Sequence, residues 1–475
     1  MSRETALAKN TFIMTIGTVL PKVSYLITLP IVTAKLTKAE YGTYDLITTM
    51  VSLFLPVASL QIQAAAFRFL IDCKDDEREK NSIITNVVLF VTVTSLIALA
   101  ILYFALFQLS PINRILICSY FFTDILLRTL VQIVRGLSNP MLYSLCTAVQ
   151  PIVNMLLVVV LVYFIDGGLE GALVAMTIAT IAALVIVLVK GEIFTAIDFK
   201  LLSKGTLKEL IGYAWPMIPN SLSLWLLRYS DRLVLLSYIG INANAVYSAA
   251  NQIPSIYSLA NSAFTQAWQE NASITLKEED AAQYYGNMFD NILRILSGIL
   301  AMLIAVTPVL FMFLIRGNYS EAYYQMPILL MAMFFSSLSS FLGGIYVAHK
   351  KTKNVGITTV IAAVLNLLID LALINRCKIY AASVSTLAAY LFLSVYRMGN
   401  VRKFQKIQYH YDNICGCVAV LVGMCIVSWF NNIYLNILNF LIGTVFALYM
   451  NRELIRKILG MLKSKMRKKD ESSRE

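Results

Sequence analysis

Long apolar runs separated by short polar segments dominate the chain. A helix needs about 20 predominantly apolar residues to cross the hydrocarbon core of a bilayer. Runs of about that length lie near residues 12–34, 44–66, 83–107, 112–134, 141–165, 169–189, 211–239, 246–268, 288–315, 326–348, 355–374, 379–396, 413–430 and 433–450. The pattern predicts an all-α polytopic membrane protein with about 14 transmembrane helices.

Composition and cysteine spacing agree with a membrane class. Hydrophobic residues make up 58% of the 475 residues and charged residues only 14%, whereas soluble domains carry roughly a quarter charged residues. The first run contains Lys22 and no small-residue cleavage site follows it, so we expect a retained span rather than a removed signal peptide. The seven cysteines form no CxxC pair, and Cys415 and Cys417 lack further ligands at zinc spacing. No metal site is predicted.

Lysine and arginine are distributed unevenly between alternate polar segments. One set of segments, which includes both ends of the chain, holds most of the cations. The other set holds only Lys35, Lys38, Arg114, Arg316, Arg376 and Lys378. Cytoplasmic loops carry the excess of Lys and Arg, so both termini are predicted to be cytoplasmic. Much of the net charge of +12 lies in the tail from Arg452 to Arg474, which favours contact with anionic lipid headgroups over nucleic-acid binding.

A polar segment from Lys190 to Glu209 divides the runs into six and eight. Residues 40–45 (EYGTYD) and 243–248 (ANAVYS) each place a tyrosine at the start of a span, and Pro56 and Pro254 follow within those spans. Prolines at corresponding places in two halves of a transporter indicate its central site. The similarity predicts two parallel, pseudo-symmetric halves around a central cavity.

Two pairs of opposite charges lie inside predicted spans, where one charge costs about 2.5–3.5 kcal/mol on insertion. Asp124 and Arg128 are four residues apart, as are Asp290 and Arg294. Residues at this spacing share a helix face. Each pair is therefore expected to be either an internal ion pair or part of a substrate site.

Other cations inside the spans have positive charge to spare. Lys22 has no acid within one helical turn, and Arg228 and Arg232 share a face as like charges, of which Asp231 offsets only one. We expect these residues to line a water-filled cavity that binds an anion, and a diphosphate matches arginine forks. The candidate substrate-binding residues are Lys22, Arg228, Arg232, Arg128 and Arg294, and the candidate coupling or structural ion-pair residues are Asp231, Asp124 and Asp290.

The remaining ionisable residues are expected at the membrane interface. Asp45 and Asp370 are assigned to span ends, where water solvates them, and His349 and His410 lie beside basic loop residues. The sequence shows no nucleophile–base set and no glycine-rich phosphate loop. No catalytic residue is predicted, and the chain is not expected to be an enzyme.

Two stretches resemble polysaccharide-biosynthesis flippases, of the oligosaccharide or O-antigen type, in the multidrug/oligosaccharidyl-lipid/polysaccharide exporter superfamily. Residues 7–47 read LAKNTFIMTIGTVLPKVSYLITLPIVTAKLTKAEYGTYDLI. Residues 216–254 read PMIPNSLSLWLLRYSDRLVLLSYIGINANAVYSAANQIP, with an Asp-Arg pair before a long apolar run. The hydropathy profile is also similar over nearly the whole chain.

The resemblance implies a flippase. Such a protein moves undecaprenyl-diphosphate-linked oligosaccharide repeat units across the bacterial plasma membrane by alternating access, with H⁺ or Na⁺ as the possible coupling ion and no other cofactor. In this family, basic cavity residues are linked to the lipid diphosphate and sugar, and the matching positions are Lys22 and Arg232. The implied partners are the lipid-linked oligosaccharide, membrane lipids, and a polysaccharide polymerase with its chain-length machinery.

The resemblance also implies a domain plan. It comprises an N-terminal six-helix lobe (1–190), a cytoplasmic linker (191–210), a second six-helix lobe (211–397), two extra C-terminal helices (398–450) and a basic cytoplasmic tail (451–475). A multidrug or metabolite exporter of the same superfamily is the main alternative, although it favours acidic rather than basic cavity residues. A membrane-embedded polysaccharide polymerase or glycosyltransferase is less favoured, because no catalytic constellation is visible.

Overall fold

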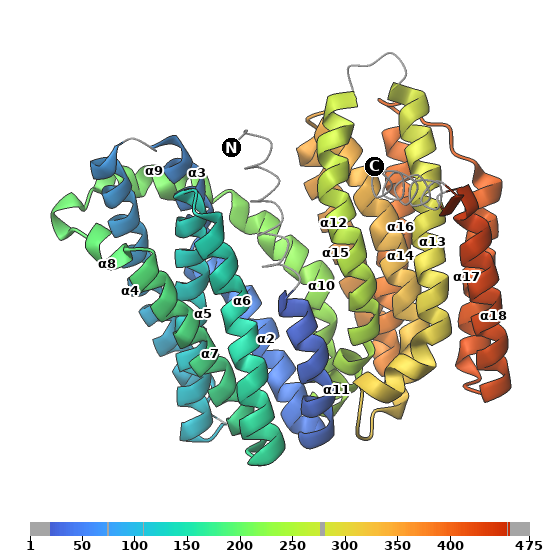
Figure 1. Cartoon of the computed structure of the whole chain (residues 1–475), viewed down its shortest axis with the longest axis horizontal. Coiled ribbons are helices and arrows are strands. Elements are labelled where there is room, and N and C mark those ends of the chain that lie inside the picture. The colour runs from blue at the N-terminus through green and yellow to red at the C-terminus, as the bar shows by residue number, and fades with distance from the viewer. Residues whose placement is uncertain (1–19, 74–75, 108, 276–280, 454, 457–475) are drawn as a thin grey trace, which may run out of the picture. The chain divides into compact units, whose positions relative to one another are not determined.

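The computed structural model describes residues 20–73, 76–107, 109–275, 281–453 and 455–456. Over these residues the chain is helical and contains no strand (Figure 1). The first predicted span, 12–34, begins outside the described residues, and residues 20–35 are helical. The predicted all-α fold class is confirmed.

Helices of the first half follow the predicted apolar runs. They are α2 (Lys38–Ala58), α3 (Ile62–Asp72), α4 (Glu77–Ala105), α5 (Pro111–Gly136), α6 (Pro140–Val158) with the π-helical turn η1 (Val159–Phe164), and α7 (Gly168–Lys190). The linker contains α8 (Ile193–Ala196), the 3-10 turn η2 (Phe199–Leu201) and α9 (Lys204–Ala214). Local capping fixes the helix starts. Thr37 and Glu40, for example, form a capping box at the start of α2.

Helices of the second half are α10 (Met217–Tyr238), α11 (Ile241–Ala250), α12 (Gln252–Thr275), α13 (Ala281–Leu314), α14 (Ser320–Ala348), α15 (Thr352–Cys377), α16 (Ile379–Val401), α17 (Tyr411–Trp429) and α18 (Ile433–Met450). Among the described helices, ten are long and apolar enough to cross a membrane, or eleven if α2 and α3 form one bent span. The helix α10, which carries the predicted site charges, is not among them. The count of about 14 spans stays a prediction.

The chain forms two compact units. The first unit comprises Met1–Tyr229, Gly240–Ala245 and Leu314–Asn318, and the second comprises Ser230–Ile239, Val246–Phe313 and Tyr319–Glu475. The domain boundaries expected from the sequence stay predictions.

In the first unit α5 packs against α3, α4, α6 and α7. Phe121, Ile125 and Val187 belong to the hydrophobic core that these helices share. The helix α2 ends soon after Pro56, and Leu60 and Gln61 then take left-handed backbone conformations. These two left-handed residues interrupt the helix, and the chain bends there by 58° before α3 begins.

The linker of the first unit is fixed to the beginning of α4. Ser82 donates its hydroxyl to the Leu201 carbonyl at 2.9 Å, and Thr85 Oγ1 accepts the Asp198 N–H at 3.0 Å. Ile193 of α8 is fully buried. The linker is therefore a packed part of the first unit.

In the second unit α14 is the central helix and packs against α12, α15, α16 and α17. Trp268 of α12 stacks on Phe341 of α14 with ring centroids 4.3 Å apart, and its Nε1 donates to the Phe341 carbonyl at 2.8 Å. The last two helices are joined by Asn439 Nδ2, which donates to the Met424 carbonyl at 3.1 Å. This packing provides the frame for the buried charges of the second unit.

Candidate functional site

A buried carboxylate, Asp231, is the centre of a hydrogen-bond network in the second unit. It lies on α10 and is 1% exposed. Its Oδ2 accepts hydrogen bonds from Tyr247 Oη at 2.7 Å and from Thr386 Oγ1 at 2.6 Å. Its Oδ1 accepts one from Asn366 Nδ2 at 2.8 Å. Hydrogen bonds to an ionised acceptor are stronger than neutral ones, so donors on α11, α15 and α16 stabilise this carboxylate.

A second carboxylate, Asp370, lies one helical turn after Asn366 on α15. Its exposed fraction is 0%, and neither of its oxygens has a hydrogen-bond partner among the described residues. The Asn366 Oδ1 atom is likewise buried with no partner among them. Asp370 thus lies one helical turn from the residue that donates to Asp231. The expectation that Asp370 lies at a water-solvated interface is wrong, because the packed helices exclude water from it.

We call Asp231, Tyr247, Asn366, Asp370 and Thr386 the acid cluster. Burying an ionised carboxylate without a partner is costly, so such a group binds a cation or becomes protonated. The oxygens of the acid cluster that lack partners suit either a proton or a hard cation such as Na⁺. Within the described ranges no group of three or more His, Cys, Asp or Glu residues occurs that could hold a metal ion.

In the first unit, Asp124 and Arg128 of α5 form an ion pair. Arg128 Nε lies 2.5 Å from Asp124 Oδ2, and the side chains are 52% and 1% exposed. The internal ion pair is thus confirmed, while the role of Arg128 in substrate binding stays a prediction. The buried carboxylate holds one edge of the guanidinium and leaves the rest of the side chain accessible.

The three cations predicted to bind an anion differ in exposure. Lys22, in the helical residues 20–35, is half-buried, Arg228 is exposed, and Arg232 is half-buried. Arg228 and Arg232 are four residues apart on the continuous helix α10 and lie on one stripe of it. Their anion-binding role stays a prediction.

Asp290 and Arg294 on α13 do not form the internal ion pair, which was one of two expectations for them, and a substrate role for Arg294 stays a prediction. Asp290 Oδ2 instead lies 2.6 Å from His410 Nδ1, and Arg294 Nη1 lies 3.6 Å from Glu453 Oε2. Both partners come from segments more than one hundred residues later in the chain. The two charges of α13 therefore connect this helix to the C-terminal part of the second unit.

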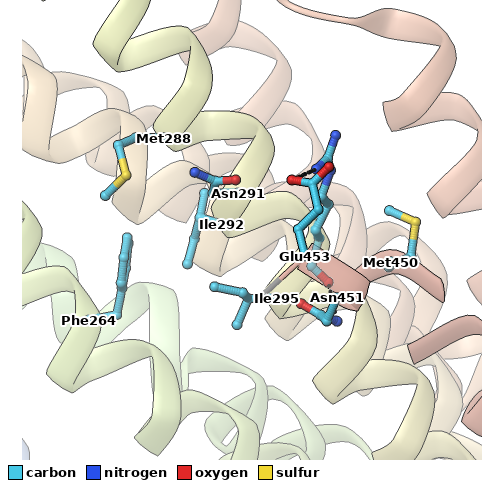
Figure 2. Close-up of a pocket in the computed structure, with 9 residues that line it drawn as sticks. Phe264, Met288, Asn291, Ile292, Ile295, Met450, Asn451 and Glu453 are labelled. Atoms are coloured by element: carbon cyan, nitrogen blue, oxygen red, sulfur yellow. Dashed lines mark hydrogen bonds and ion pairs between the residues drawn. The ribbon is translucent and has the colours of Figure 1, made fainter. Parts of the chain in front are cut away.

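Arg294 lines a cavity of about 220 Å³ in the second unit, shown in Figure 2. Its other lining residues are the polar Asn291, Asn451 and Glu453 and the apolar Phe264, Met288, Ile292, Ile295 and Met450. An apolar groove of about 620 Å³ shares Ile295 and Asn451 with this cavity and is lined by residues of α12, α13 and α18. A cavity of mixed polar and apolar lining that adjoins an apolar groove suits an amphipathic ligand.

Arg397 was expected just beyond the span at 379–396, but it is a buried residue of α16. It is 4% exposed, and it donates to the Ser339 carbonyl at 2.9 Å and to Thr358 Oγ1 and Thr359 Oγ1 at 3.0 Å each. No carboxylate lies within ion-pair distance of it in the part of the chain that the structure describes. This arginine joins α14, α15 and α16 through neutral acceptors.

A helical bundle with buried carboxylates and arginines inside its apolar helices is characteristic of membrane transporters. The family model described as "Polysaccharide biosynthesis protein" matches residues 7–268, and the chain belongs to this family. None of the curated proteins matches the sequence.

Solved structures share the fold at low sequence identity. The lipid II flippase MurJ in an inward closed conformation has a TM-score of 0.68 and 14% identity, over 94% of this chain and 100% of that chain. An inward-facing multidrug resistance MATE family transporter has a TM-score of 0.64 and 13% identity, over 82% and 98%. A transporter from Pyrococcus furiosus has a TM-score of 0.57 and 14% identity, over 83% and 95%. The chain has the fold of the MOP transporter superfamily.

Proposed function

We propose that this protein is a flippase that moves undecaprenyl-diphosphate-linked oligosaccharide repeat units across the bacterial plasma membrane by alternating access. The observation that carries the proposal is the match to the polysaccharide biosynthesis family over residues 7–268. The MOP transporter fold supports transport rather than catalysis. Both termini lie in the cytoplasm, and a polysaccharide polymerase with its chain-length machinery receives the product.

Basic residues bind the diphosphate of the substrate. Arg228 and Arg232 form one stripe on α10, and like charges at this spacing repel each other unless an anion lies before them. Lys22 supplies a further cation from the helical residues 20–35, and Arg128 keeps an accessible guanidinium against a buried carboxylate. A diphosphate offers several charged oxygens to such groups, and arginine binds them in bidentate fashion.

The apolar groove of the second unit supports a lipid-linked substrate. Its lining includes Tyr257, Ile299 and Leu303, and the adjoining cavity contains Arg294, Asn291 and Asn451. The isoprenoid chain would lie along the apolar side chains of the groove, and its polar end would lie in the adjoining cavity. A small hydrophilic substrate would make no use of this groove.

The acid cluster is the site for the coupling cation. Asp370, Asn366 and Asp231 would hold a proton or a sodium ion, which would offset one of the two buried negative charges. Asp231 already holds α10, α11, α15 and α16 together through its hydrogen bonds. Neutralisation of the acid cluster therefore changes the forces between four helices, as a coupling site requires.

Deletion of the gene tests the proposed function. In a cell that makes a surface glycan, loss of the protein should leave lipid-linked repeat units in the inner leaflet and reduce the surface polymer. The measurement is the leaflet distribution of extracted lipid-linked oligosaccharide, with re-expression of the wild-type chain as the control. Normal export without accumulated intermediate, in a cell with no second flippase, would rule out the assignment.

A multidrug or metabolite exporter is the second candidate function. The fold similarity to a multidrug resistance MATE family transporter and the buried acid cluster favour it. Under this alternative, deletion should sensitise cells to cationic compounds and leave the glycan unchanged. The same deletion strain therefore distinguishes the two functions.

A further inference from the structure

The linker between α7 and α10 has a buried face and an exposed apolar face. Ile193 and Leu210 have exposed fractions of 0% and pack into the first unit. Four other large apolar side chains of the linker remain exposed. They are Phe194 (65%), Phe199 (67%), Leu202 (43%) and Trp215 (59%), and we call them the linker surface. Exposed aromatic side chains at this density need a partner.

Hydrogen bonds place the linker where α4 changes from polar to apolar. The first residues of α4 are Glu77-Arg78-Glu79-Lys80-Asn81, and buried apolar residues begin at Ile83. The linker contacts use Ser82 and Thr85, which lie about 8–12 Å along the helix from its first residue at 1.5 Å per residue. The polar-to-apolar boundary of a membrane-spanning helix marks the membrane–water interface.

The linker surface continues the lipid-facing side of α7. Ile178, Ile181, Val185 and Val189 are exposed by 41–66% and recur every three or four residues. They form one stripe of a helix that is long and apolar enough to cross a membrane. The stripe ends at the last turn of α7, and Phe194 follows within five residues. The lipid-facing surface of the first unit therefore extends directly into the linker.

Charge plays the smaller part in this surface. The segment from Lys190 to Glu209 contains four lysines, at 190, 200, 204 and 208, and three acids, at 192, 198 and 209. The charges nearly cancel, so attraction to anionic lipids is weak. Lysine side chains extend their charged ends to water while their stems cover apolar surface, and this leaves the aromatic rings as the principal contact.

We propose that the linker surface is an interfacial anchor that is seated in the headgroup region of the adjacent leaflet. Its partner is the phospholipid bilayer surface, in the cytoplasmic leaflet under the proposed topology. Amphipathic segments of this kind bury their apolar face about 5–10 Å into the headgroup and acyl boundary. The anchor holds the crossing between the two halves of the chain at the membrane surface, whichever substrate the protein carries.

Photoactivatable lipids test the anchor on the unaltered chain. The protein is placed in lipid nanodiscs that contain phosphatidylcholine with a diazirine either near the headgroup or at the acyl-chain end, and adducts are mapped by mass spectrometry. The headgroup-proximal probe should label residues 194–215, and the chain-end probe should label the middle of α7 around Ile178 and Ile181. Linker peptides without adducts, in discs where α7 is labelled, would overturn the proposal. Intermolecular cross-links between linker peptides in place of lipid adducts would also overturn it, by assigning the surface to a second copy.

A matched pair of substitutions separates anchoring from folding. Phe199→Ser and Phe107→Ser each remove an exposed phenyl ring, 67% and 68% exposed respectively, but Phe107 lies just beyond the other end of α4. The Phe199 variant should lose linker labelling several-fold, while the Phe107 variant should keep it. Unchanged labelling of α7 in both variants reports an intact bundle. Equal linker labelling in the two variants contradicts the anchor.

Discussion

Asp231 and Asp370 are both buried, yet only Asp231 has its oxygens satisfied. Asp231 accepts three hydrogen bonds, whereas both oxygens of Asp370 lack partners among the described residues. An unsatisfied buried group costs stability, and a satisfied one loses stability when a partner is removed. The two acids should therefore respond in opposite ways to the same substitution.

Asp370→Asn should leave the thermal unfolding midpoint in detergent unchanged or higher, because a neutral amide replaces a carboxylate that makes no hydrogen bond. Asp231→Asn should lower stability by about 1–3 kcal/mol, since an amide cannot accept at both of its ends.

Asp370→Asn should also remove the dependence of transport in proteoliposomes on a H⁺ or Na⁺ gradient. Asp412→Asn, at an exposed acid, is the control. Unchanged ion dependence in Asp370→Asn would exclude the acid cluster as the coupling site.

Substitution of Lys22 or Arg232 tests the anion site. Lys22→Ala and Arg232→Ala should impair transport but not membrane insertion, because removing a charge makes insertion easier. Lys22→Arg should be milder, whereas Arg232→Lys should still impair transport because lysine lacks the bidentate fork. Transport activity and the amount of protein in the membrane fraction are measured together. Full activity in both alanine variants would show that these cations do not bind substrate.

Helical spacing predicted one ion pair and failed on the other. Asp124 and Arg128 pair as expected, while Asp290 and Arg294, at the same spacing, contact His410 and Glu453. Spacing describes only neighbours on one helix, and partners from other helices depend on packing that sequence does not show. The acid cluster was missed for the same reason, since its members come from four different helices. The sequence feature that could have revealed the cluster is the four-residue spacing of Asn366 and Asp370, which places both on one face of α15.

At the scale of elements, apolar runs predicted the helices well and their interruptions less well. The run near 44–66 is two helices, because the chain bends after Pro56. The run near 246–268 likewise begins within α11 and continues as α12. A run of apolar residues shows which part of the chain lies in lipid. A bend within the run depends on a few backbone angles, such as the left-handed conformation of Gln61, which hydropathy does not indicate.

The beginning of α2 packs closely on residues 241–245, which belong to the same unit. A Cβ atom on Gly42 would lie 2.5 Å from the Ile241 carbonyl oxygen and 3.3 Å from Ala245 Cβ. Asn244 Nδ2 donates to the Gly42 carbonyl at 3.1 Å. The two similar motifs, 40–45 and 243–248, are thus in direct contact, and the contact requires a residue without a side chain.

Gly42→Ala should lower stability by about 1–3 kcal/mol, because the backbone oxygen opposite cannot move away without displacing its helix. Gly212 of α9 is the matched control, since a Cβ atom there meets nothing within 4 Å. Gly212→Ala should raise stability by about 0.5–1 kcal/mol, because alanine favours the helix. Thermal unfolding midpoints in one detergent measure both. Shifts of the same sign would refute the close contact at Gly42.

At the scale of the whole molecule, the loop-charge pattern makes the sharpest prediction. Reporter fusions after Lys80, Lys208 and Lys406 should report the cytoplasm, and fusions near Lys38 and Asn242 should report the exterior. Between Lys38 and Lys80 lie α2 and α3, and the predicted alternation requires that these two helices form one bent span. Paired reporters that are active on opposite sides of the membrane provide the measurement. An inversion at one fusion would show that the span count is wrong before that point.

The contacts of the linker with α4 bear on how the protein is made. The hydrogen bond between Ser82 and Leu201 closes a loop of 119 residues, and that between Thr85 and Asp198 closes one of 113 residues. All four residues precede α10 in the chain, so they are synthesised before the helices of the second unit. Domains fold as units during synthesis, the N-terminal one first. A nascent chain that extends through α9 already contains both partners of each of these hydrogen bonds. The first unit can therefore begin to assemble while the second unit is still being translated.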